Sequence, residues 1–109
     1  MGEVGTKKLF EDERIVVWEF ALEPGERTPC HTHDKDYMWY VIEGSTLEVF
    51  GEDGRPLGSF EARTGEIFSI DCRGGELVSN DGRGLRAPAT HSARNTGRTR
   101  YREILVEKK

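Results

Sequence analysis

The stretch PCHTHDKDYMWYVIEGSTLEVF, residues 29–50, decides the fold because it joins two closely spaced histidines to strand-like sequence. Residues 37–42 are aromatic, apolar or β-branched, which predicts a strand. Residues 46–50 alternate apolar and polar side chains, the pattern of a half-buried strand. In extended backbone, residues i and i+2 face the same side. His31 and His33 can therefore both face one point inside the protein.

Strand-like segments continue along the rest of the chain, and turn sequences rich in Gly, Pro, Asn and Asp separate them. Besides the histidine segment, strands are expected at 14–22, 37–42, 46–50, 57–62, 66–71, 76–79, 85–88, 90–95 and 101–107. No segment has a clear helical period, and no long repeat is visible. This pattern predicts an all-β sandwich or barrel. The length predicts one domain over residues 1–109, with its core at about 14–107.

Composition narrows the classes of function. The chain has 20 acidic and 16 basic residues and a net charge of -4, so we expect no nucleic-acid partner. No apolar run is long enough to span a bilayer, and no signal peptide is visible, which predicts a cytoplasmic protein without a membrane partner. The two cysteines, Cys30 and Cys72, are expected to be free thiols.

Arginines concentrate in the last third of the chain. Solvated strand surfaces are the simpler interpretation, since most arginines stay at the surface. The alternative is that one of them lines a pocket and pairs with an anionic ligand. The candidates are Arg83, Arg86, Arg94, Arg98, Arg100 and Arg102.

The third histidine, His91, lies far along the chain at the start of another predicted strand. A closed β fold would bring it beside His31 and His33. Three converging imidazoles suit a divalent transition metal such as Fe, Mn, Ni, Cu or Zn.

These residues carry a family resemblance. Gly25, His31, His33 and Gly44 have the spacing of the first cupin motif, in which a glutamate stands where this chain has Tyr37. The first motif is therefore complete except for its carboxylate.

A second segment resembles the other cupin motif. Pro88, His91 and Asn95 follow its order, and the spacing from histidine to asparagine matches. The leading glycine of this motif is either Gly65, followed by an inserted hairpin, or Gly82, and the first assignment leaves the better strand. Together the two motifs span most of the chain.

The resemblance implies a single-domain cupin β-barrel, which is a double-stranded β-helix or jelly roll and is usually dimeric. It implies that His31, His33 and His91 are metal ligands. Tyr37 then stands in the place of the fourth ligand. A homodimer and a small-molecule partner are the expected assemblies.

The missing carboxylate leaves three interpretations. In the first, the site is a three-histidine centre with open positions for substrate. In the second, Tyr37 binds the metal or acts beside it as a catalytic proton donor. In the third, the site has lost its metal and is a plain pocket. Strand parity predicts that Tyr37 and Trp39 face the cavity. The nearby Asp34 and Asp36 are expected to be solvated turn residues.

Two functions are compatible with these residues. The first is a metalloenzyme that acts on a small organic molecule, expected to carry a carboxylate. The alternative is a non-catalytic cupin that binds a small molecule with a weak or lost metal site. The fold cannot select a reaction, because cupins catalyse many.

Overall fold

The computed structural model describes residues 4–109, which form eleven β-strands and no helix within that range. No helix of the described chain could therefore cross a membrane. The strands are β1 (Lys7–Glu11), β2 (Ile15–Leu22), β3 (His31–Thr32), β4 (Tyr37–Glu43), β5 (Ser45–Gly51), β6 (Pro56–Ala62), β7 (Ile67–Arg73), β8 (Glu76–Ser79), β9 (Arg86–Pro88), β10 (Thr90–Asn95) and β11 (Tyr101–Lys108).

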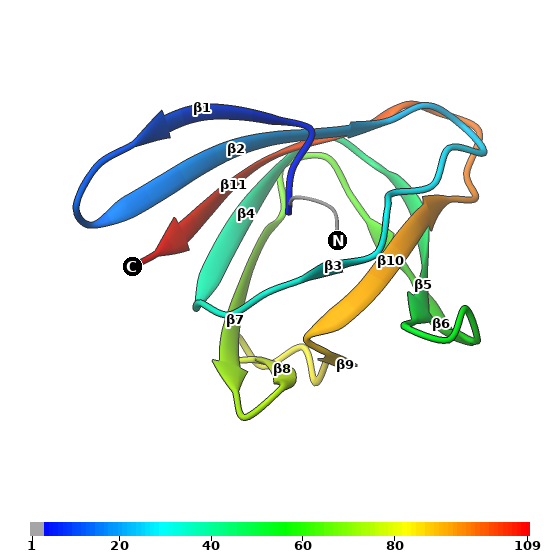
Figure 1. The fold of residues 1–109 in the computed structure, drawn as a ribbon. Coiled ribbons are helices and arrows are strands. Elements are labelled where there is room, and N and C mark those ends of the chain that lie inside the picture. The colour runs from blue at the N-terminus through cyan, green and yellow to red at the C-terminus, as the bar shows by residue number, and fades with distance from the viewer. Residues whose placement is uncertain (1–3) are drawn as a thin grey trace.

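The strands form two antiparallel sheets. The larger has the order β1-β2-β11-β4-β7-β8-β9 and the smaller the order β3-β10-β5-β6. In Figure 1, β2, β11 and β4 run along one side of the molecule, and β3, β10 and β5 along the other. Strands distant in sequence are neighbours, since β11 lies between β2 and β4. The core lies between the two sheets.

Alternation along the central strands places one face of each in the core. Every second residue of β2 is buried, including Trp18 and Phe20, and β11 follows the same period. Val41 and Tyr101 have no exposed surface, and Phe68 is 2% exposed. Burial of such large side chains is the main stabilising contribution to a fold of this kind.

Two glycines of the first motif have clear structural reasons. Gly25 has a φ of +85°, in the left-handed region that favours glycine. Gly44 lies at the junction of β4 and β5, where a Cβ atom would lie 2.5 Å from the carbonyl oxygen of Ala62. Any larger residue at position 44 would push the two chain segments apart.

Asn95 of the second motif is fully buried, and its amide group uses all its hydrogen-bonding capacity. Its Oδ1 accepts from the Ser45 hydroxyl at 2.7 Å and from the Gly97 backbone N–H at 3.0 Å. Its Nδ2 donates to the carbonyl oxygens of Leu22 at 3.0 Å and Thr99 at 2.8 Å. Asn95 therefore joins three chain segments at one end of the barrel.

The all-strand architecture agrees with the predicted fold class, and most predicted strands differ by one or two residues at their ends. The strand β1 was not predicted. All five of its residues are exposed and it pairs at the sheet edge with β2, so it lacks the alternation that reveals a half-buried strand. The strand β3 is only two residues long, and His33 lies just after it.

Candidate metal centre and cavity

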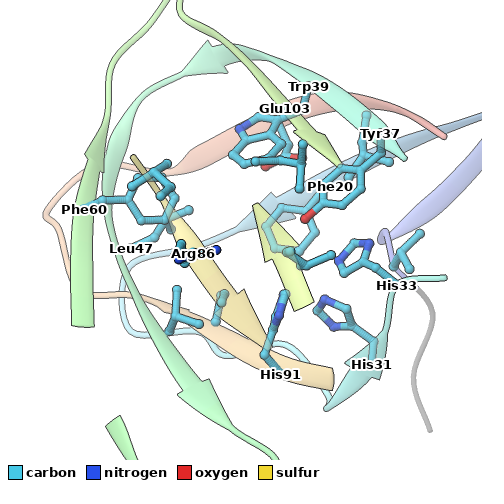
Figure 2. Close-up of a pocket in the computed structure, with 18 residues that line it drawn as sticks. Phe20, His31, His33, Tyr37, Trp39, Leu47, Phe60, Arg86, His91 and Glu103 are labelled. Carbon is cyan, nitrogen blue, oxygen red and sulfur yellow. The ribbon is translucent and has the colours of Figure 1, made fainter. Parts of the chain in front are cut away.

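The fold brings all three histidines together. β10 pairs with β3 in a register that places His91 opposite His31. The backbone N–H of His33 donates to the carbonyl oxygen of Ala89 at 2.9 Å, which holds His33 against the same strand pair. The ring centroids are 4.8 to 5.2 Å apart. One potential ligand atom from each ring lies within 4.8 Å of the others, and Figure 2 shows the three rings converging at one end of a cavity.

Backbone carbonyls orient two of the imidazoles. Nδ1 of His31 lies 3.1 Å from the Pro29 oxygen, and Nδ1 of His91 lies 2.8 Å from the Pro88 oxygen. A carbonyl can only accept, so each Nδ1 carries a proton and each Nε2 keeps a lone pair. This is the usual arrangement of a metal-binding histidine.

The environment of the His33 side chain is also compatible with metal binding. Its ring is 4% exposed, and its Nδ1 has no hydrogen-bond partner among the described residues. Burying an imidazole without a partner is unfavourable, and coordination of a cation by the ring offsets that cost. The three residues are therefore a suitable donor set for a transition metal.

Burial keeps the cluster uncharged. Desolvation, followed by the neighbouring histidines, lowers the pKa of His31 to about 4 and that of His33 to about 2. Desolvation also lowers the pKa of His91, partly opposed by its bond to Pro88. Neutral imidazole is the form that binds metals, so the cluster needs no deprotonation at neutral pH.

Tyr37 occupies the position of the expected glutamate and stacks on His33, with ring centroids 4.3 Å apart and planes 11° apart. Burial, followed by the nearby Glu103, raises its pKa well above the ordinary value. Its phenol is therefore neutral and supplies no negative charge to the cluster. Within residues 4–109, no carboxylate joins the three histidines.

The two nearby aspartates lie outside the cluster. Asp34 is exposed and pairs with Lys35 at 2.9 Å. Asp36 is also exposed, and its Oδ1 accepts the backbone N–H of Cys72 at 2.8 Å. Both aspartates are thus exposed in the loop before β4, and neither belongs to the histidine cluster.

A cavity of about 140 Å³ opens from the histidines into the barrel. Tyr37 and Trp39 both line it, stacked in a row that continues to Phe68. Most of the wall is apolar, including Phe20, Leu47, Phe60, Leu77, Leu85 and Leu105. A cavity of this size is close to the roughly 150 Å³ that holds one benzene molecule.

One arginine of the predicted set lines the cavity. This is Arg86, whose guanidinium also lies 3.4 Å from a Glu76 oxygen at the exposed edge of the sheet. Arg83, Arg100 and Arg102 make surface ion pairs instead. The arginine-rich segment is thus largely balanced by acidic neighbours.

The cavity also contains a buried carboxyl group that was not predicted from the sequence. Glu103 on β11 is 5% exposed, lines the cavity and accepts the hydroxyl proton of Tyr101. Burial raises its pKa to about 8, so the group is largely protonated at neutral pH. No signal in the sequence identifies it as inward, because both faces of β11 mix charged and apolar residues.

No family model matches the sequence, and no curated protein does. Solved structures do match. A cupin domain from Bordetella pertussis Tohama I is 18% identical, with a TM-score of 0.67 over 99% of each chain. An RmlC-like cupin with a double-stranded β-helix from Methanocaldococcus jannaschii is 16% identical, with a TM-score of 0.57 over 94% of this chain and 76% of that one. The polyketide cyclase RemF from Streptomyces resistomycificus is 22% identical, with a TM-score of 0.54 over 89% of this chain and 56% of that one.

These identities are low, but the structural agreement covers almost the whole chain. The described residues of this chain form two antiparallel sheets and no helix, with the core between the sheets. The chain therefore has the cupin fold, a double-stranded β-helix.

Proposed function

We propose that this protein is a small metal-binding cupin and that it works as a metalloenzyme on a small organic molecule. The observation that carries the proposal is the neutral cluster of His31, His33 and His91, two of them buried and the third half-buried, at the wall of a largely apolar cavity. Grouping three imidazoles this way solely for packing would be unfavourable, because each carries polar nitrogens into the interior.

The three histidines would hold the metal. A metal with three protein ligands keeps positions open for a substrate, whose carbonyl or hydroxyl it polarises. The apolar wall excludes water and strengthens electrostatic interactions inside the cavity. Tyr37 stacks on His33 and presents a neutral phenol, whose raised pKa favours donating a hydrogen bond to a bound molecule over releasing its proton.

The second candidate is a non-catalytic small-molecule-binding protein. The neutral Tyr37 in place of a carboxylate favours it, because a weaker ligand set lowers metal affinity. A ligand that raises the melting temperature without being converted would support this candidate over the enzyme.

Metal analysis tests the proposal. We expect about one transition-metal ion per chain after loading and desalting, and loss of that metal in His31→Ala and His91→Ala. Cys30→Ala is the matched control, because its thiol adjoins His31 in sequence but lies outside the cluster. A wild-type protein that retains no metal, or histidine variants that retain it fully, would refute the metal site.

We also propose that the protein is a homodimer. Support comes from the outer face of the larger sheet, where Tyr40 pairs with Ile104 and with Ile67. Tyr40 and Ile67 are 47% and 52% exposed, and Met38 beside them is 36% exposed. Sedimentation should show a dimer that Tyr40→Lys weakens, whereas a monomeric wild-type protein would exclude this assembly.

The proposed location is the cytoplasm. Both cysteines, Cys30 and Cys72, are free thiols. Free thiols persist most readily in a reducing compartment. Cell fractionation with an antibody against the native protein would test this location.

A further inference from the structure

The cavity has a second polar end, away from the histidines. Figure 2 shows Glu103 and Trp39 together at this end, with Tyr37 and Phe20 between them and the histidines. The register of β11 on β4 pairs Glu103 with Val41 and Leu105 with Trp39. Glu103 and Trp39 are thus diagonal neighbours on the same inward face, and both line the cavity.

No cation among residues 4–109 compensates Glu103 through an ion pair. The ion pairs among residues 4–109 do not include it. Its only hydrogen-bond partner in this part of the chain is the Tyr101 hydroxyl, which donates to Oε1. A carboxyl group buried without a cation keeps its proton, as its raised pKa also indicates.

A protonated carboxyl group is a donor as well as an acceptor. Tyr101 donates to Oε1, and no hydrogen bond of Oε2 is found among residues 4–109, so an acid proton on Oε2 has no acceptor in this part of the chain. Beside it, the indole Nε1 of Trp39 lies near the Tyr101 hydroxyl without reaching hydrogen-bond geometry. Two N–H or O–H donors therefore border the same apolar space without an acceptor.

Buried donors without acceptors are unfavourable, so a bound molecule that supplies an acceptor gains affinity. From this juxtaposition we infer that Glu103 is a recognition residue. Its carboxyl group donates a hydrogen bond to a neutral oxygen, a carbonyl or hydroxyl, on a molecule about the size of one six-membered ring. Trp39 adds the second donor and an aromatic wall. This inference deepens the proposed function, because it names the ligand class of the same cavity.

Two ring probes of equal size isolate the oxygen. Cyclohexanone and methylenecyclohexane have the same shape, but only the ketone accepts a hydrogen bond. Titration of metal-free, isotope-labelled protein, followed by NMR, gives a dissociation constant for each without interference from a metal. The ketone loses hydrogen bonds to water on binding and the alkene does not, so the ratio of the two dissociation constants is compared between the wild type and Glu103→Leu. We expect this ratio to favour the ketone about tenfold more in the wild type, the discrimination typical of one buried hydrogen bond.

Three variants separate recognition from structure. Glu103→Leu removes the donor and should lose the wild type's preference for the ketone relative to the alkene. Glu103→Gln should keep it, because the amide oxygen can accept from Tyr101 while the amide N–H group donates to the ketone. The control is Glu107→Leu on the same strand; Glu107 accepts the indole N–H of Trp18 at 2.7 Å and does not line the cavity. It should retain the preference.

The outcomes are distinct. Binding of neither probe, or a ketone-to-alkene affinity ratio in Glu103→Leu equal to that of the wild type, would each overturn the inference. If Glu103→Leu does not fold, the carboxyl ¹³C resonance of Glu103 in the wild type decides, since it should shift with the ketone and not with the alkene. Metal content, measured separately on the histidine variants, tests the proposed metal site, so either idea can fail alone.

Discussion

The substitution Glu103→Gln should remove a strong pH dependence from the stability of this protein. Burial raises the pKa of Glu103 from 4.5 to about 8. Between these values the unfolded chain has lost the proton and the folded chain still holds it. The folded state thus binds more protons, so the free energy of unfolding falls as pH rises. The stabilisation is complete below pH 4.5 and is lost through pH 8.

The size of the effect follows from the shift. One pKa unit corresponds to about 1.4 kcal/mol, so Glu103 should cost the wild type about 3 kcal/mol between pH 4.5 and 7, and about 4 kcal/mol by pH 8. The titratable side chains nearest to it, Tyr37 and Tyr101, have raised pKa values and stay neutral in this range. Neither should contribute to the slope.

Urea unfolding of both proteins at several pH values measures the effect. The histidines titrate in the same range, but they are present in both proteins, so the difference between the two unfolding free energies isolates Glu103. That difference should move by about 3 kcal/mol in favour of Glu103→Gln as pH rises from 4.5 to 7. A difference that does not vary with pH would refute the argument that the buried carboxyl group keeps its proton.

Three further predictions concern other residues. In metal-free Glu103→Gln, the free energy of unfolding should fall by about 3 kcal/mol when the pH is lowered from 6.5 to 5. The pKa values of His31 and His33 are lowered in the folded state, so only the unfolded chain takes up protons in this range. An unfolding free energy from urea that does not vary with pH would contradict this. Tyr37→Glu should raise the zinc affinity at least about tenfold in calorimetric titration, because it adds a carboxylate ligand. Tyr37→Phe should leave the zinc affinity nearly unchanged, and a large loss in this variant would show that the phenol is a ligand. Asn95→Ala should cost about 3 kcal/mol in urea unfolding, because it leaves several buried groups unpaired; the exposed Asn80→Ala is the control, and equal effects would contradict the role of Asn95.

The convergence of the histidines could be predicted because it needs only simple rules. The period of two places His31 and His33 on one side, and a closed β fold brings in His91. The same parity predicts that Tyr37 and Trp39 face inward. What these rules cannot provide is the register of β10 on β3, which sets His91 opposite His31 and depends on the whole fold.

Glu103 was not predictable by the same reasoning, and the reason lies in β11 itself. One face of this strand carries Tyr101, Glu103, Leu105 and Glu107, and the other carries Arg102, Ile104, Val106 and Lys108. Both faces mix charged and apolar residues, so the pattern does not indicate which faces the core. The inward face is decided by the neighbours of β11, since it packs between β2 and β4.

The distribution of charge in the cavity limits what can complete the site. Three neutral histidines would leave the charge of a divalent cation uncompensated, and neither Tyr37 nor the protonated Glu103 supplies a negative charge. In the proposed enzyme, a bound molecule with an anionic group at the histidine end would supply the compensating charge. Glu103, at the other end, favours a neutral oxygen. A molecule that satisfies both ends carries one anionic group, such as the carboxylate expected from the sequence, and one carbonyl or hydroxyl across a single ring.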